Sequence, residues 1–173
     1  MKKIFRSLFI LVFLYSCSYK AKEVEETLYE MTRNEIDLDF NSLIQITGNT
    51  TNLLEYEYIW LIYIPSDYCK PCWVQELKEW EKYVKKYDRT NAISIISSKG
   101  KDYSEVKTFI NNLNLNLPVY LDSTDVFKKK NNFIPEKISY HTFMIDKSKK
   151  IKIVGNPIKN EEIKELFEKN YIK

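Results

Sequence analysis

The sequence has little glycine, with three residues in 173, and it has only one histidine. The shortage of glycine argues against a phosphate-binding glycine loop, and no such motif is present. Internal repeats, low-complexity tracts and domain linkers are also missing. Hydrophobic residues make up 44% of the chain, which suits a folded core and is too much for a disordered protein. These features predict one globular domain with a short extension.

A strong net charge is missing as well. The formal net charge is +3, but the first 16 residues contain three basic residues and no acidic one. Without them, 27 − 3 = 24 basic residues stand against 24 acidic ones. We therefore expect no nucleic-acid partner, because binding to a phosphate backbone needs an excess of basic side chains.

The N-terminus has the pattern of an export signal. A basic start at residues 2–6 precedes an apolar run at 8–14, which is too short to span a bilayer comfortably. The following Leu14-Tyr15-Ser16-Cys17 resembles the bacterial lipobox, in which the cysteine is lipidated and becomes the first residue of the mature protein. An ordinary signal peptide, or a buried apolar helix with an incidental Cys17, is the alternative.

The lipobox resemblance implies three parts of the chain. Residues 1–16 would be the signal peptide, 17–33 a polar tether and 34–173 the folded domain. The protein would be lipid-anchored to a bacterial membrane and face an extracytoplasmic space such as the periplasm, where disulfides can persist.

The other two cysteines form a C-x-x-C motif, Cys69-Lys70-Pro71-Cys72. A β-prone run at 58–64 precedes it, and apolar residues recur at helical spacing after it. This arrangement places Cys69 at a helix N-terminus, where unpaired N–H groups and the helix dipole favour a thiolate. Lys70 adds a positive charge, and Pro71 suits the first turn of a helix. We interpret Cys69 as the attacking thiolate and Cys72 as the more buried resolving cysteine.

Apolar patterns elsewhere predict alternating strands and helices. Strands are expected at 35–40, 43–46, 57–64, 91–96, 117–121, 141–146 and 150–154. Helices are expected after Cys72 to about 86, from a cap at 102 or 104 to about 113, and at 122–131 and 160–171. The order predicts an α/β fold with a central mixed sheet flanked by helices, and the first two strands would form an N-terminal β-hairpin.

From residue 57 onward, this order and the C-x-x-C motif resemble the thioredoxin-like proteins of the TlpA/ResA type. Residues 143–146, Phe-Met-Ile-Asp, are similar to the Phe-Leu-Ile-Asp strand of that family. The resemblance implies a thioredoxin-like fold and a thiol-disulfide oxidoreductase without a cofactor. Its partners would be client protein disulfides or thiols and a membrane electron donor, with the enzyme acting as a reductase.

Three positions depart from the family pattern. Tyr140 stands where the family has a cis-proline, and Gln75 stands where the TlpA/ResA type often has a glutamate. Glu76 is the next residue, but its side chain is expected to point about a third of a turn round the helix from that of Gln75. Tyr63 replaces the buried acid of thioredoxin. A buried carboxylate that could help to deprotonate Cys72 is therefore not evident.

Three aromatic residues are candidates for contacts at the site. Tyr68 could belong to a hydrophobic docking surface, and Tyr140 or His141 could lie over Cys69. His141 could act as an acid or base, or bind Cu(I) together with Cys69 and Cys72. We favour the simpler interpretation, in which His141 begins a strand and points into the core or solvent.

The C-x-x-C motif has other interpretations. A zinc site has too few ligands, because only His141 would join Cys69 and Cys72. A structural bridge over two residues would constrain the unfolded chain little. A peroxiredoxin-like peroxidase shares the fold, and Ser66 stands where that family has a threonine, but no arginine partner is placeable. A non-enzymatic copper or metal chaperone would use the two thiols with His141.

Overall fold

The computed structural model describes residues 21–48, 53–98 and 103–172. The predicted signal peptide and Cys17 lie outside these residues. The described part begins with a helix at residues 21–33. Within the described residues, no helix combines the length and the apolar character that crossing a membrane requires.

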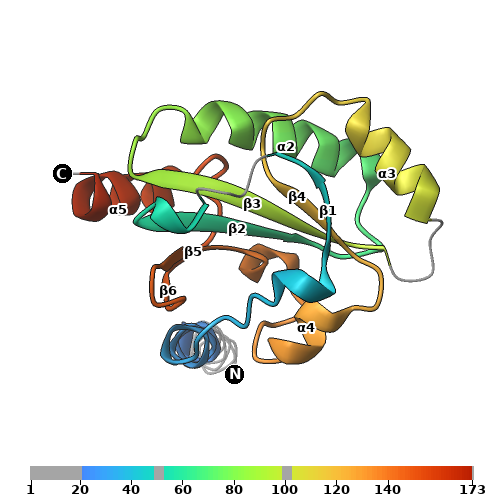
Figure 1. Ribbon diagram of the computed structural model, residues 1–173. Helices are drawn as coiled ribbons and strands as arrows, with labels where there is room; N and C mark the ends of the chain where they lie inside the picture. The colour runs from blue at the N-terminus through green and yellow to red at the C-terminus, as the bar shows by residue number, and fades with distance from the viewer. Residues whose placement is uncertain (1–20, 49–52, 99–102, 173) are drawn as a thin grey trace, which may run out of the picture.

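Six strands form one mixed sheet in the order β1-β4-β3-β2-β5-β6 (Figure 1). The strands are β1 (Ile44–Thr47), β2 (Tyr58–Ile64), β3 (Thr90–Ser97), β4 (Val119–Asp122), β5 (Thr142–Asp146) and β6 (Ile151–Val154). The neighbours β2, β3 and β4 are parallel, whereas β1, β5 and β6 are antiparallel to their partners. The central strand β2 is apolar along its length because both of its faces are covered.

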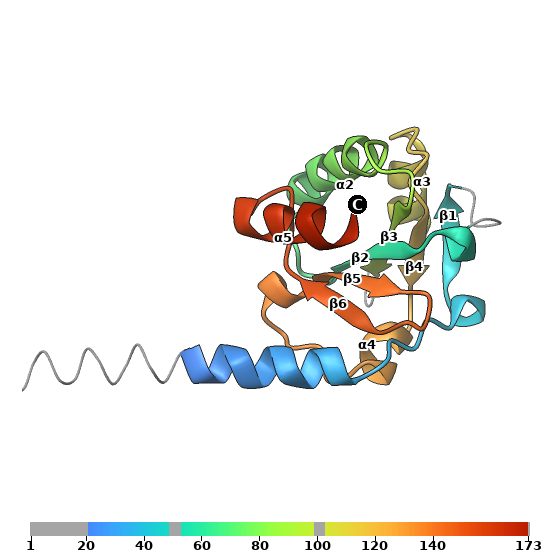
Figure 2. The same ribbon diagram turned by 90° about the vertical axis from the view of Figure 1, so that its left-hand side faces the viewer.

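Helices cover both faces of the sheet, as Figures 1 and 2 show. They are α2 (Lys70–Val84), α3 (Tyr103–Asn111), α4 (Val126–Lys130) and α5 (Glu161–Tyr171), with short 3-10 helices η1 (Phe40–Ser42), η2 (Leu53–Glu55) and η3 (Ile138–Tyr140). One core cluster joins α2, α3 and α5 to the sheet, and a second joins α4 and helix 21–33 to the opposite face. The predicted α/β architecture with flanking helices is confirmed.

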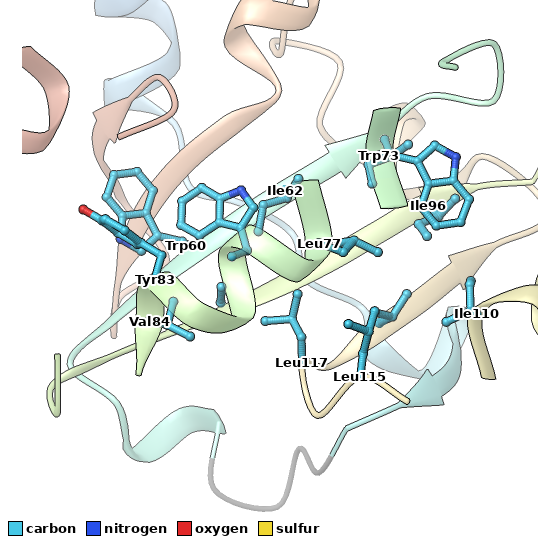
Figure 3. Close-up of a cluster of buried hydrophobic side chains, with 14 of the residues drawn as sticks. Trp60, Ile62, Trp73, Leu77, Tyr83, Val84, Ile96, Ile110, Leu115 and Leu117 are labelled. Carbon is cyan, nitrogen blue, oxygen red and sulfur yellow. The ribbon is translucent and has the colours of Figure 1, made fainter. Parts of the chain in front are cut away.

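The helix that carries the C-x-x-C motif is held firmly against the sheet. Leu77 of α2 is completely buried in the core cluster that also contains Trp60 of β2 (Figure 3). Trp80 of α2 is completely buried as well, and it packs on Trp60 with ring centroids 5.4 Å apart. Phe167 of α5 also packs edge-on against Trp60, with ring centroids 5.4 Å apart. The core therefore fixes the direction of α2 and the position of its N-terminus.

The predicted N-terminal hairpin is wrong. Glu35 makes an isolated bridge to Lys150 beside β6, whereas β1 pairs with β4 at the opposite edge of the sheet. Polar and apolar residues alternate at 35–40, and the apolar Ile36 and Leu38 are buried in the second core cluster. The buried side chain of Asn131 replaces a partner strand, because its amide binds both the N–H and the carbonyl of Asp37 at 2.8 and 3.0 Å. The alternation correctly indicated an extended segment with one buried side, but not its pairing.

Residues 21–33, most of the segment expected to be a polar tether, form a helix. Met31, near its end, has no exposed surface and belongs to the second core cluster. Toward the start of the helix Leu28 is half-buried and Val24 is 42% exposed. The apolar face of this helix therefore begins in the core and continues outward.

Candidate functional site

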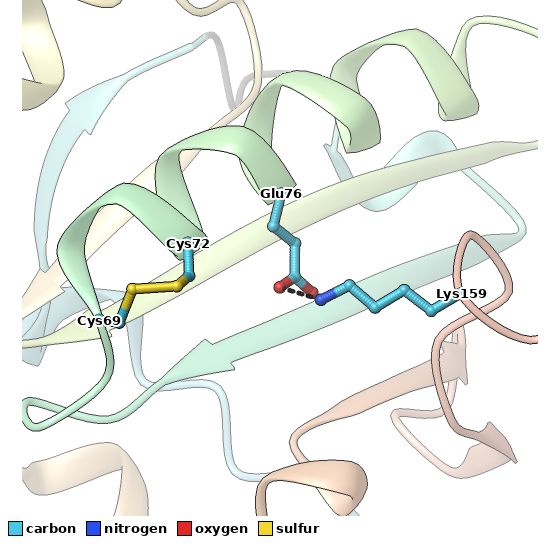
Figure 4. Close-up of a disulfide and its surroundings, with 4 residues drawn as sticks. All are labelled: Cys69, Cys72, Glu76 and Lys159. Carbon is cyan, nitrogen blue, oxygen red and sulfur yellow. Dashed lines mark hydrogen bonds and ion pairs between the residues drawn. A yellow bond between two sulfur atoms is a disulfide. The ribbon is translucent and has the colours of Figure 1, made fainter.

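Cys69 and Cys72 form a disulfide at the N-terminus of α2, with Cα atoms 5.3 Å apart (Figure 4). A turn closed by a hydrogen bond from the Tyr68 N–H to the Pro65 carbonyl connects β2 to the motif. Cys69 is the N-cap of α2, and its carbonyl accepts the N–H groups of Cys72 and Trp73 at 3.1 and 3.3 Å. The predicted sequence of strand, turn, C-x-x-C and helix is confirmed.

Both cysteines are exposed, so Cys72, which the sequence analysis expects to be the more buried of the two, also lies at the surface. The buried position in the first turns of α2 belongs to the next residue, Trp73, which packs on Phe109 of α3 with ring centroids 5.5 Å apart. Because Trp73 points into the core, the sulfur of its neighbour Cys72 stays at the surface. Both sulfurs are thus accessible to another molecule.

A buried carboxylate lies one helical turn behind the disulfide. Glu76 is only 6% exposed and accepts hydrogen bonds from Asn156 Nδ2 at 2.8 Å and Lys159 Nζ at 2.7 Å. Figure 4 shows Cys72 and Glu76 on the same side of α2, which follows from their i, i+4 spacing. The carboxylate thus lies one helical turn from Cys72, on the side of α2 that carries the disulfide.

Sequence reasoning missed Glu76 because it followed the family position, which is Gln75. The side chain of Gln75 is exposed and donates to Glu79 at 2.7 Å. The i, i+4 relation to Cys72 was the available signal. The partners that make burial of Glu76 tolerable, Asn156 and Lys159, lie about half the chain away and could not be inferred.

A cavity of about 510 Å³ adjoins the site. Its walls come from the end of β2 and the turn before Cys69, from α2, from the η3 region, from the loop between β6 and α5 with the start of α5, and from helix 21–33. Tyr68 and Tyr140 both line it, as do Glu76 and Lys159. The structure thus brings the two candidate tyrosines to one groove. Lys70 and Pro71 occupy the first turn of α2, as predicted.

His141 is a core residue, in agreement with the simpler interpretation. It is 2% exposed, packs edge-on against Tyr63 with ring centroids 5.2 Å apart, and donates from Nε2 to the Pro135 carbonyl at 2.8 Å. It forms no ligand group with Cys69 and Cys72, since no cluster of three Cys, His, Asp or Glu side chains among the described residues could hold a metal ion. The alternative metal site of Cys69, Cys72 and His141 is therefore not formed among the residues that the structure describes.

Burial of His141 predicts a specific pH dependence of stability. Desolvation lowers the pKa of His141 in the folded protein, whereas the unfolded chain titrates near 6.5. As the pH falls below about 6.5, the unfolded state binds a proton that the folded state resists, so the free energy of unfolding decreases. His141→Gln, which can keep the hydrogen bond to Pro135, is expected to show a flatter pH dependence.

Urea unfolding of both proteins between about pH 7.5 and about pH 5 measures this difference. Asp39 does not obscure this range, because its hydrogen bonds with Ser42 and Lys130 lower its pKa to about 2. Parallel curves for the two proteins would show that His141 is not the titrating group.

Comparison with known proteins supports the fold. Residues 35–154 match the family described as AhpC/TSA. The N-terminal domain of PilB from Neisseria gonorrhoeae is 20% identical, with 74% of this chain and 88% of that domain covered and a TM-score of 0.52. The exposed lipoprotein thioredoxin Etrx1 of Streptococcus pneumoniae is 18% identical over 73% of this chain and 98% of its own, with a TM-score of 0.51.

A thioredoxin-like protein from Aeropyrum pernix is 17% identical, covers 88% of this chain and 98% of its own, and gives a TM-score of 0.50. No curated protein matches the chain. At these identities the solved structures establish the fold, and the match over 35–154 establishes the family. The chain therefore belongs to the AhpC/TSA family and has the thioredoxin-like fold that its sequence predicts.

Proposed function

We propose that the protein is a thiol-disulfide oxidoreductase that exchanges the Cys69–Cys72 disulfide with cysteines of client proteins. The observation that carries this proposal is an exposed disulfide at the N-terminus of a helix, within a thioredoxin-like fold. Helix N–H groups and the helix dipole stabilise a thiolate at this position, which is the reactive form of cysteine.

In the proposed reaction, the reduced protein attacks a client disulfide through the Cys69 thiolate. A bond forms between Cys69 and one client sulfur, while the other client sulfur leaves as a thiolate. Cys72 then loses its proton and attacks Cys69, which closes the Cys69–Cys72 disulfide and releases the second client thiol. The client gains two electrons and the protein loses two. The same steps in reverse would oxidise a client.

Glu76 has a part in the second step of this proposal. Its carboxylate lies one turn from Cys72 and can take the proton that Cys72 must lose. The hydrogen bonds from Asn156 and Lys159 hold the carboxylate in place and offset the cost of burying it. Glu76 would thus supply the buried acid that Tyr63 and Gln75 do not.

We further propose that the protein is exported, anchored through a lipid on Cys17, and supplied with electrons by a membrane donor so that it works as a reductase. The support is the lipobox-like N-terminus, which would place the Cys69–Cys72 pair in a compartment where disulfides can persist. A pneumococcal lipoprotein with the same fold is described as exposed, which is compatible with this placement.

The peroxidase alternative has less support. Ser66 is half-buried before Cys69, but the two described arginines are engaged elsewhere. Arg33 pairs with Glu30 on helix 21–33, and Arg89 pairs with Glu57 near the start of β2, at the far end of that strand from the disulfide. Neither is available to assist peroxide cleavage at Cys69.

Reduction of insulin by the detergent-solubilised full-length protein, with dithiothreitol as electron source, tests the proposed function. We expect catalysed insulin precipitation, and a single two-electron transition when the protein is equilibrated in glutathione buffers. Absence of both would contradict the proposal. Consumption of hydrogen peroxide without insulin reduction would instead support the peroxidase.

A further inference from the structure

The groove beside the disulfide has one wall that comes from outside the main domain. Val24 and Leu28 of helix 21–33 line the same cavity as Tyr68, which directly precedes Cys69. Figure 2 shows this helix running beneath β6, with its beginning projecting past the sheet. A client chain linked to Cys69 would therefore lie close to this helix.

The apolar face of helix 21–33 extends further than its attachment to the core requires. Met31, Leu28 and Val24 share one face, at spacings of three and four residues. Met31 is fully buried, Leu28 is half-buried and Val24 is 42% exposed. Met31 thus attaches the helix, whereas Leu28 and Val24 present apolar surface to the groove and partly to solvent.

The η3 region also lines the groove, and it limits which backbone hydrogen bonds a client can form there. The N–H groups of Tyr140 and His141 donate to the carbonyls of Lys137 and Ile138, each at 3.0 Å. These two N–H groups are therefore not available to pair with a client backbone. What η3 does offer is side-chain surface, because Ile138 is 45% exposed and lines the groove with Tyr140.

We propose that Val24 and Leu28 are specificity-determining residues, which bind an apolar side chain of the client next to its reactive cysteine. The inference rests on the proposed function, because exchange at Cys69 is what brings an extended polypeptide into the groove. Apolar surface from Tyr68 and Ile138 faces the same space, so the matching client segment is an extended, apolar one. Helix 21–33 thus forms part of the client-binding site, in addition to linking the N-terminal segment to the folded domain.

Two synthetic peptides test the proposal. Both carry one cysteine as a mixed disulfide with thionitrobenzoate, flanked by leucine in one peptide and by serine in the other. The reduced full-length protein attacks the peptide sulfur and releases coloured thionitrobenzoate, and closure of the Cys69–Cys72 disulfide releases the peptide thiol. The second-order rate constant is measured for the wild type, for Val24→Ser/Leu28→Ser, and for Tyr29→Ser as a control on an exposed position of the same helix (65% exposed).

For the leucine peptide, the double variant is expected to react about tenfold more slowly than the wild type, as loss of apolar contacts in a pocket predicts. The serine peptide and glutathione disulfide should react equally with all three proteins, and Tyr29→Ser should match the wild type throughout. Equal loss with glutathione disulfide would indicate damage to the fold and overturn the specificity role. If the double variant equals the wild type with the leucine peptide, this inference fails while the proposed function stands. If the wild type reacts with none of these disulfides, the proposed function itself fails.

Discussion

Replacing Cys69 with serine is expected to lower client reduction by more than about 10³-fold, because a hydroxyl cannot replace the attacking thiolate. Cys69 is the N-cap of α2, the position closest to the unpaired N–H groups of the helix. Insulin reduction by the full-length variant measures the loss. Serine is nearly the same size and the site is exposed, so the fold should survive, which thermal unfolding checks.

The Cys72→Ser variant is the matched control for this experiment. It retains the Cys69 thiolate but cannot close the internal disulfide, so it should accumulate a covalent complex with its client. Non-reducing electrophoresis and mass spectrometry detect this complex and identify the client cysteine. A stable complex with Cys69→Ser, and none with Cys72→Ser, would reverse the roles assigned to the two residues.

Replacing Glu76 with glutamine is expected to slow the resolving step about 10²-fold, which is the usual contribution of one general base. Glutamine has nearly the same volume and can still accept a hydrogen bond from Lys159, but it cannot take the proton of Cys72. The lifetime of the mixed disulfide, followed by rapid acid quench, measures this step. The attack by Cys69 should keep its rate.

Glu79→Gln provides the control for Glu76→Gln, because it makes the same chemical change one turn of helix further from Cys72. A purely structural role of Glu76 would alter the unfolding free energy of Glu76→Gln without changing the pH profile of resolution. We expect instead that the pH profile shifts in Glu76→Gln and not in Glu79→Gln. Identical profiles in both variants would remove Glu76 from the mechanism.

The parts of the fold that local patterns specify were predictable. The apolar run of β2 and the helical spacing of Trp73, Leu77 and Trp80 required burial on defined faces, and the structure buries them there. The C-x-x-C motif between them then had to lie at the helix N-terminus. These features depend on neighbours within a few turns of the chain, which is why the sequence was sufficient.

The features that were missed depend on distant partners. Burial of Glu76 requires Lys159 and Asn156, and the extended segment at 36–39 is held by Asn131 rather than by a second strand. Exposure of Cys72 follows from the packing of Trp73 against α3. In each case the local pattern allowed two outcomes, and a contact far along the chain selected one.

With the proposed lipid anchor, the helix at residues 21–33 would also set how far the protein can reach from the membrane. If Cys17 carries a lipid, the four residue steps from it to position 21 extend over at most about 14 Å. The helix itself is about 20 Å long and is fastened to the core at Met31. The redox pair would then work within a fixed, short distance of the bilayer, on the end of a stiff arm. Its clients would be proteins whose oxidised cysteines lie close to the membrane surface, while those deep in the surrounding compartment would stay beyond its range.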